Sequence, residues 1–334
     1  MSRSMKRVLV TGSAGFIGSA FVRMLRGLSG KEYSVEAPEL LVGLDAFRIG
    51  SSKDSYAMVP DFEMIEGDIG DTALLAKLQA KYAFDTVINF AAESHVDRSI
   101  EDSSAFVHSN VLGVVSLLEF FKDKPLRFVQ VSTDEVYGSL GDKGAFTESS
   151  QIEPNSPYSA SKAASDLFVR AFVHTHKMDA VVTRCSNNYG PYQFPEKFIP
   201  VIISKALKNE KIPVYGSGKN VRDWIYVEDH CWGVYLAATQ GKMGEVYNFG
   251  GHGECENLVL AKKILEHLGK GQDLLSFVED RKGHDWRYFI DSKKAEEELS
   301  WNPQWKFEEA LQFTVQWYVD NLPKWNLTKG DFTK

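Results

Sequence analysis

Short apolar runs alternate with amphipathic segments along most of this chain. Each apolar run ends in glycine or a polar residue, which is typical of buried strands in a parallel sheet. Between the runs, apolar positions recur at helical spacing. The expected strands are 8–10, 40–44, 62–66, 85–91, 127–131 and 180–185. The expected helices are one that ends near 26, and then about 72–81, 104–121, 157–176, 257–268 and 307–321. This alternation predicts an α/β fold.

A glycine-rich turn follows the first expected strand. Gly12, Gly15 and Gly18 have the spacing Gly-x2-Gly-x2-Gly and lead into the first helix. Glycine lets the backbone approach a pyrophosphate, and a helix N-terminus provides N–H groups and the positive end of a dipole. The spacing differs from the common Gly-x-Gly-x2-Gly fingerprint, so the alternative is a turn that merely needs glycine. We interpret the turn, with Phe16 and Ile17, as a dinucleotide-binding site.

The second expected strand ends in Asp45. An acidic residue at this place accepts hydrogen bonds from the adenine ribose of NAD and repels the 2′-phosphate of NADP. The sequence therefore favours NAD, in a doubly wound parallel sheet of the Rossmann type. The separation between Gly18 and Asp45 exceeds the usual distance, and we expect 27–39 to be an inserted loop. The alternative is that Asp45 only caps a loop.

Two adjacent carboxylates follow the expected strand 127–131. Asp134 and Glu135 would repel each other, and burial of either without a partner is costly. In open parallel sheets, ligands bind beyond the carboxyl ends of the strands. Carboxylates that share one ligand are typically one acid and one base. Since alternate strand residues face opposite sides, we expect the chain to leave the strand conformation at Thr133. The alternative is a solvated turn in which Asp134 caps a helix.

Tyr158 and Lys162 lie four residues apart at the start of an expected helix, so they share one helical face. A free phenol titrates near pH 10 and is a poor base at neutral pH. An ammonium group about 4 Å away, at an effective dielectric near 20, favours the phenolate by roughly 4 kcal/mol, or about three pKa units. We therefore expect Lys162 to lower the pKa of Tyr158. The alternative is an amphipathic helix with an exposed lysine.

The chain of 334 residues is long enough for two parts. After residue 184 the composition shifts toward loops and aromatic residues. We expect 1–184, with a later interleaved segment at about 221–250, to form the NAD-binding domain. The remainder, 185–334, is expected to be mainly a smaller α/β lobe that binds the substrate.

Composition excludes several classes of protein. A net charge of −7 argues against a nucleic-acid partner. We expect no apolar segment long enough to span a bilayer, and hence no membrane partner. Cys185, Cys231 and Cys255 share no metal-binding spacing, so we expect no metal site. Buried thiols in a reduced, cytoplasmic protein are the simplest interpretation.

The motifs resemble those of the nucleotide-sugar 4,6-dehydratases, a family of the extended short-chain dehydrogenase/reductase superfamily. The resemblance runs from Arg7 to about Trp305. Its specific parts are 91–99, 132–138, 186–199, 222–224 and 283–285. The glycine-rich turn and Tyr-x3-Lys are shared by the wider superfamily. The resemblance implies NAD as cofactor, a nucleotide-diphosphate hexose as substrate, and a homodimer formed by the helices that begin near Ser104 and Pro157.

The resemblance also implies residue roles. Tyr158 takes the O4 proton while the C4 hydride passes to NAD, with Thr133 near O4 and Lys162 on the nicotinamide ribose. Glu135 removes the C5 proton, protonated Asp134 donates to the departing C6 hydroxyl group, and the hydride returns to C6. The other implied cofactor residues are Asp68, Ile69, Ala91, Ala92, Ser132 and Asn188. The implied substrate residues are Ser94, Asn187, Glu196, Lys197, Phe198, Pro213, Tyr215, Arg222, Asn257, Arg281 and His284.

Two segments depart from the family pattern. Ala46-Phe47-Arg48-Ile49-Gly50-Ser51 follows Asp45 where a lysine or asparagine and a Tyr-Ala-Gly-Asn run are usual, and Lys282 stands in place of a proline. A dTDP-linked glucose is the expected substrate, with UDP- or CDP-glucose as alternatives. A 4-epimerase or UDP-glucuronate decarboxylase would use the Tyr158–Lys162 pair without needing Asp134 and Glu135. A non-catalytic NAD-binding regulator typically loses the tyrosine or the lysine.

Overall fold

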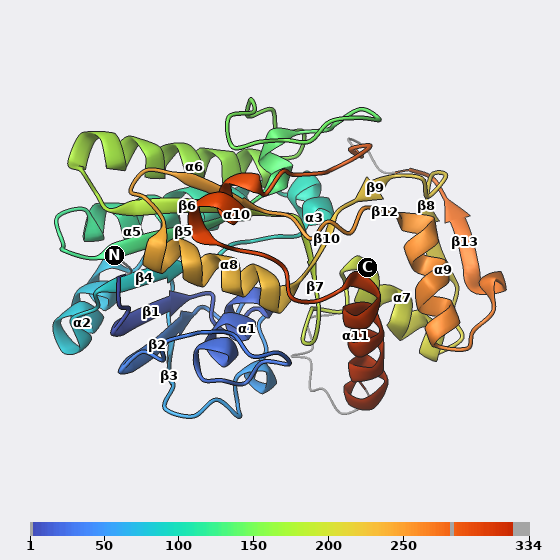
Figure 1. The fold of residues 1–334 in the computed structure, drawn as a ribbon, viewed down its shortest axis with the longest axis horizontal. Coiled ribbons are helices and arrows are strands. Elements are labelled where there is room, and N and C mark those ends of the chain that lie inside the picture. Colours follow the sequence, from blue (N-terminus) through green and yellow to red (C-terminus); the bar gives the residue numbers. More distant parts are fainter. Residues whose placement is uncertain (1–2, 281–283, 323–334) are drawn as a thin grey trace.

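A seven-stranded parallel sheet forms the centre of the larger part of the molecule (Figure 1), in the order β11-β6-β5-β4-β1-β2-β3. The computed structural model describes residues 3–280 and 284–322. The strands are β1 (Arg7–Thr11), β2 (Leu40–Asp45), β3 (Glu63–Glu66), β4 (Thr86–Asn89), β5 (Arg127–Thr133), β6 (Ala180–Cys185) and β11 (Val246–Phe249). The strand order reverses between β1 and β4, so the expected doubly wound sheet is confirmed.

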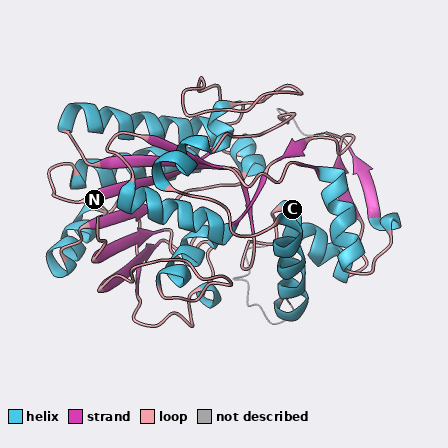
Figure 2. Ribbon diagram, viewed as in Figure 1, coloured by secondary structure: helices cyan, strands magenta, loops and turns pink. Residues whose placement is uncertain are grey.

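Helices cover both faces of this sheet (Figure 2). One face carries α2 (Thr72–Tyr82), α5 (Gly113–Phe121) and α6 (Pro157–His176). The other carries α1 (Phe16–Leu25), α8 (Val227–Gln240) and α10 (Lys293–Leu299). Each face has its own apolar core, which includes Leu117 and Val169 on the first and Phe21 and Trp301 on the second. Burial of these side chains fixes the helices on the sheet.

A smaller α/β lobe stands beside the carboxyl ends of the strands, to the right in Figure 1. Its helices are α7 (Phe198–Leu207), α9 (Asn257–His267) and α11 (Phe307–Asn321), around a core that includes Ile203, Trp224 and Ile264. Its strand pairs are β7 (Asn187–Tyr189) with β10 (Trp224–Tyr226), β8 (Ile212–Tyr215) with β13 (Leu275–Val278), and β9 (Val221–Arg222) with β12 (Cys255–Glu256). The elements β11, α8 and α10 come after residue 184 in the chain but pack with the large sheet. A division of the molecule near residue 184 therefore stays a prediction.

Short elements connect the strands to the helices. They are η1 (Lys53–Ser55), α3 (Val96–Glu101), α4 (Ser104–Phe106), the π-helix η2 (Val107–Leu112), η3 (Asp134–Tyr137) and η4 (Gln272–Leu274). The expected helix 104–121 is therefore α4, η2 and α5 in succession. By length and composition, Ser104–Phe121 is apolar enough to cross a membrane. The expectation that no segment has this length is wrong, although the inner side of the segment packs on the sheet through Leu117 and Phe121.

The loop 27–39 joins the two parts of the molecule. The Gly30 N–H donates to Glu228 Oε1 at 2.8 Å, and the Tyr33 hydroxyl donates to Asp229 Oδ1 at 2.9 Å. Lys31 pairs with Glu309 at the start of α11, at 3.1 Å. The inserted loop expected from the long Gly18–Asp45 spacing is thus present, and it is anchored to α8 and α11.

The cysteines lie in different surroundings. Cys185 and Cys231 are buried free thiols, as expected. Cys255 is half-buried, so the expectation of three buried thiols is wrong for this residue, which lies on the short strand β12 of the smaller lobe.

Candidate active site

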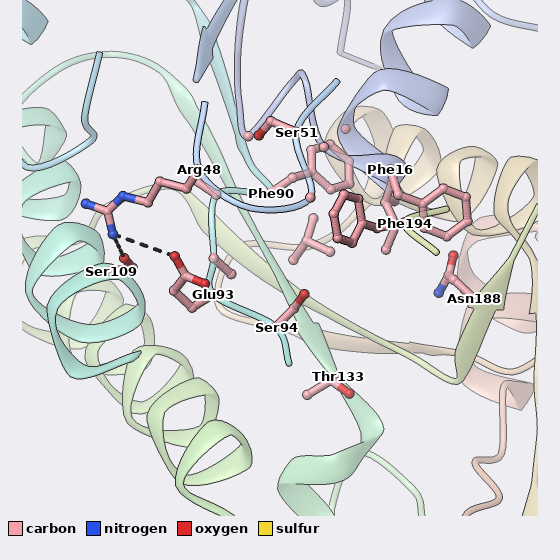
Figure 3. Close-up of a pocket in the computed structure, with 18 of the residues that line it drawn as sticks. Phe16, Arg48, Ser51, Phe90, Glu93, Ser94, Ser109, Thr133, Asn188 and Phe194 are labelled. Carbon is pink, nitrogen blue, oxygen red and sulfur yellow. Dashed lines mark hydrogen bonds and ion pairs between the residues drawn. The ribbon is translucent and has the colours of Figure 1, made fainter. Parts of the chain in front are cut away.

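A pocket lies beyond the carboxyl ends of β1, β2, β4 and β5 (Figure 3). The predicted catalytic residues Thr133, Asp134 and Glu135 line it. So does every predicted cofactor residue: Gly12, Gly15, Phe16, Ile17, Gly18, Asp45, Asp68, Ile69, Ala91, Ala92, Ser132, Tyr158, Lys162 and Asn188. Four predicted substrate residues also line it, namely Ser94, Asn187, Glu196 and Lys197. The fold brings these separate motifs to one cavity.

The glycine-rich turn packs against the end of β4. Gly12 has a φ of +67°, and a Cβ atom there would lie 2.6 Å from the Ala91 nitrogen. A Cβ atom on Gly18 would lie 2.2 Å from the Gly12 carbonyl oxygen. Side chains at both places are therefore excluded, which leaves a bare backbone before the N-terminus of α1. This backbone fits a dinucleotide pyrophosphate.

Asp45 organises the loop that follows β2. Its carboxylate accepts hydrogen bonds from the Ala14 N–H at 2.9 Å, the Phe47 N–H at 2.8 Å and the Ser51 hydroxyl at 2.8 Å. These contacts match the loop-capping alternative. Asp45 also lines the pocket, so a contact with the adenine ribose stays a prediction.

The chain leaves the strand conformation directly after Thr133, as expected. Thr133 is the last residue of β5 and its hydroxyl oxygen accepts from the Glu135 N–H at 3.3 Å, which starts the short helix η3. Thr133 therefore occupies the cap position, and the alternative that gave this role to Asp134 is wrong. The turn brings both carboxyl groups to the pocket.

Asp134 is a buried acid. Its side chain is 2% exposed, and Oδ2 has no hydrogen-bond partner. Burial raises the pKa of Asp134 well above its usual range, and the charges of Glu135 and Asp223 act in the same direction. A raised pKa favours the protonated form of this carboxyl group, which is the form that can donate a proton.

Tyr158 and Lys162 project from the first turns of α6. The helix begins with Pro157 at its first position and a capping box formed by Ser156 and Ser159. Tyr158 is 8% exposed and Lys162 is 4% exposed. The local sequence thus fixes the start of the helix and with it the position of both side chains.

The expected pKa of Tyr158 is wrong in direction. Burial raises this pKa well above its usual value, and the charge of Glu135 adds to the effect, whereas a hydrogen bond with Thr133 opposes it. The Lys162 ammonium group donates to the Val131 carbonyl oxygen at 2.7 Å, and burial lowers its pKa. Burial of the phenol and this backbone contact of the lysine explain the difference.

Asn110 links the pocket loop to α6. It lies in the π-helix η2, where its Nδ2 donates to the Glu93 carbonyl at 3.0 Å and to the Ser161 hydroxyl at 2.8 Å. Its Oδ1 accepts from the Glu93 N–H at 2.8 Å. Ser161 in turn donates to the Tyr158 carbonyl at 2.7 Å. Asn110 therefore joins the helical segment to a loop at the site.

The remaining substrate candidates do not line this pocket. They are Phe198, Pro213, Tyr215, Arg222, Asn257 and His284, all in or beside the smaller lobe. The Arg222 guanidinium group donates to the Asp285 carbonyl at 2.9 Å and lies 4.4 Å from the Tyr288 ring centre. Arg281 and Lys282 lie outside the described residues. Contacts of these residues with a nucleotide stay predictions.

Several pocket residues were not predicted. They include Arg48, Phe90, Glu93, Ser109, Cys185, Gln193 and Phe194. There was a reason in the sequence to consider Arg48, because Arg48 stands in the segment that departs from the family pattern. There was no such reason for Ser109, since the pocket position of Ser109 depends on the π-helix.

The sheet, the glycine turn at its switch point and the Tyr158–Lys162 pair on a flanking helix together define an extended short-chain dehydrogenase/reductase. Within this class, the chain belongs to the nucleotide-sugar 4,6-dehydratase family. A family model described as GDP-mannose 4,6 dehydratase matches residues 9–314. A dTDP-glucose 4,6-dehydratase of Xanthomonas campestris pv. campestris (strain B100) is 48% identical over 271 residues, which are 77% of this chain and 74% of that protein.

Solved structures agree with this assignment. The dTDP-glucose 4,6-dehydratase DesIV from Streptomyces venezuelae, crystallised with NAD, has a TM-score of 0.89 at 45% identity, and the match covers 96% of this chain and 99% of that one. A UDP-glucose 4-epimerase from Thermotoga maritima has a TM-score of 0.85 at 26% identity, covering 94% and 99%. The fold is thus shared with epimerases, and the site must distinguish the reactions.

Proposed function

We propose that this chain is an NAD-dependent dTDP-glucose 4,6-dehydratase, a hydro-lyase that converts dTDP-glucose to dTDP-4-keto-6-deoxyglucose and water. The buried carboxyl group of Asp134, whose pKa is raised, is the observation that carries the proposal, because an acid is needed to expel the C6 hydroxyl group. The names and bound cofactor of the similar proteins support the choice of substrate and NAD.

The chain's own residues supply proton transfers at three atoms of the hexose. Tyr158 accepts the O4 proton in its ionised form. Burial and the charge of Glu135 oppose this ionisation, whereas the hydrogen bond with Thr133 favours it. Glu135 accepts the C5 proton, and Asp134 gives its proton to the departing C6 hydroxyl group. Bound NAD would supply the hydride acceptor for C4, and its reduced form would supply the hydride donor for C6. Gly12 and Gly18 leave backbone space for its pyrophosphate.

A 4-epimerase or a decarboxylase is the less supported function. Both reactions need oxidation at C4, but neither needs an acid at C6. Burial of the Asp134 carboxyl group costs free energy of folding, and neither of these reactions would give the group a function. A regulator without catalysis is supported still less, because the full set of proton-transfer groups lines the pocket.

The direct test is conversion of the substrate. Purified protein with NAD and dTDP-glucose should give a product lighter by one water, with no net NADH, as followed by mass spectrometry and absorbance. Parallel reactions with UDP-, CDP- and GDP-hexoses distinguish the nucleotide. If dTDP-glucose stays intact and UDP- or CDP-glucose is converted, the substrate is that alternative. If no hexose nucleotide is converted, the proposed function is wrong.

Glu135→Gln tests the assignment of the base. An amide cannot accept the C5 proton, so deuterium from D2O should no longer enter C5, and kcat should fall by about 10²–10⁴. The matched control is Glu153→Gln, an exposed residue outside the pocket, which should behave as the unmodified protein. Nuclear magnetic resonance of the product measures deuterium at C5. Undiminished deuterium entry in Glu135→Gln would remove Glu135 from its role.

We further propose a cytoplasmic homodimer formed through the helical segment 104–121 and α6. The two elements are neighbours, and their outer surfaces expose Val107 (48%), Leu112 (55%), Leu167 (54%) and Phe168 (40%). Exposed apolar side chains gathered on adjacent helices are typical of an isologous interface.

A further inference from the structure

Arg48 reaches from the loop after β2 to Ser109 and Glu93 (Figure 3), and it also pairs with Asp68. Its Nη2 pairs with Asp68 Oδ2 at 2.7 Å, and its Nη1 donates to Ser109 Oγ at 2.6 Å and lies 3.8 Å from Glu93 Oε1. We call these four residues the Arg48 bridge. They follow β2, β3 and β4 and lie on η2, so one guanidinium group ties four separate segments together.

The sheet order determines what the Arg48 bridge crosses. Strand β1 lies between β2 and β4, so a contact between the loops after β2 and β4 passes over the carboxyl end of β1. The glycine-rich turn begins there, at Gly12. All four residues of the bridge line the same pocket as this turn. A dinucleotide on the turn therefore has the bridge across the end of the pocket nearest Asp45 and Asp68.

The side chains of the Arg48 bridge can form and break their contacts over the pocket. A guanidinium group stays charged at all physiological pH values and offers several donors in a fixed plane, so it can engage two carboxylates and a hydroxyl group together. The side chains are partly exposed, at 41% for Arg48, 35% for Asp68 and 19% for Glu93. Such contacts open and close readily and weaken with salt.

We propose that Arg48 retains the cofactor: the Arg48 bridge fastens the adenosine end of NAD in the pocket, and NAD leaves only when the bridge opens. This inference rests on the proposed function, since it requires NAD as the cofactor. Arg48 belongs to the segment in which this chain departs from its family, so the retention device is a property of this sequence. It acts on binding and leaves the proton transfers at the hexose to other residues.

Release of the cofactor is the direct test. Protein loaded with fluorescent NADH is mixed with excess NAD, and the loss of bound NADH is followed in a stopped-flow instrument. Arg48→Ala should release NADH about tenfold faster, equivalent to about 1.4 kcal/mol. Arg48→Lys, which keeps the charge but loses the planar set of donors, should be intermediate. Lys77→Ala, an exposed position on α2 that removes the same charge, should match the unmodified protein.

Two further measurements separate retention from a structural effect. High salt, at about 1 M where the Debye length is about 3 Å, should speed release from the unmodified protein but not from Arg48→Ala. Glu93→Gln should also speed release, and its effect in combination with Arg48→Ala should be less than additive. The unfolding temperature of the cofactor-free variants should stay close to that of the unmodified protein.

The outcomes distinguish the two proposals. If the unmodified protein does not bind NADH, the proposed function fails. If it binds NADH but Arg48→Ala releases it within twofold of the unmodified rate, or salt has no effect on the unmodified protein, the retention role is wrong and the function stands. The salt measurement needs no variant, so the inference can be overturned even if Arg48→Ala fails to fold.

Discussion

Asp134 shows how position alone changes the chemistry of a carboxyl group. Burial at the end of β5 raises the pKa of Asp134, while Glu135, the next residue, is only partly buried. The two residues are adjacent in the 3₁₀ helix η3, where successive side chains are about a third of a turn apart. Both carboxyl groups therefore line one pocket but lie in different surroundings.

A raised pKa in the folded state has a consequence for stability. Because the folded protein holds the Asp134 proton more tightly than the unfolded chain, this residue costs stability as the pH rises above its ordinary pKa of about 3.9. Asp134→Asn removes that cost. The unfolding temperature of the variant should therefore fall less between about pH 5 and pH 8 than that of the unmodified protein.

Differential scanning fluorimetry over this pH range measures the effect. Asp123→Asn, at an exposed position, is the matched control and should follow the unmodified protein. Parallel curves for Asp134→Asn and the unmodified protein would contradict a raised pKa.

Residue types at strand ends made the pocket position of Thr133, Asp134 and Glu135 predictable, but the electrostatics of the Tyr158–Lys162 pair were not predictable. Spacing placed Tyr158 and Lys162 on one helical face, whereas the Val131 carbonyl that receives the lysine lies on a different element. Burial, which dominates the pKa of Tyr158, is likewise a property of the packed molecule. For Asp45, both interpretations required the same acidic side chain, so the sequence could not separate them.

At the scale of elements, the π-helix η2 positions Asn110 between two parts of the pocket. Asn110→Ala would remove the side chain that hydrogen-bonds to both the N–H and the carbonyl group of Glu93. We expect a loss of about 1–3 kcal/mol in the free energy of unfolding, measured by urea denaturation. Ser116→Ala, later on the same helix, should change it by less than about 0.5 kcal/mol. Equal effects of the two substitutions would contradict the bridging role of Asn110.

Strands with continuous apolar runs were the most predictable elements, since all seven residues of β5 are buried. The interruption of 104–121 by a π-helix was not predictable, because its apolar pattern also suits an uninterrupted helix. The edge strand β11 pairs with β6, which is distant in the chain, so only the fold reveals that β11 completes the sheet.

At the scale of the whole molecule, the apolar surface of α6 leads to a prediction about assembly. Leu167→Glu places a charge where Leu167 is 54% exposed beside Phe168, and a charge buried without a partner is costly. Light scattering after gel filtration should show the monomer mass for this variant and twice that mass for the unmodified protein. Met58 is 86% exposed and lies in a loop far from α6 in the sequence, so Met58→Glu should remain a dimer. A monomeric unmodified protein would refute the proposed interface.

The anchored loop 27–39 also bears on protein engineering. A chimaera that replaced the whole chain after residue 184 would remove Asp229, and Tyr33 would then face a surface without this partner. A chimaera should therefore take the loop, Glu228, Asp229 and the segment around Trp305 from the same parent protein, because this choice keeps their hydrogen bonds.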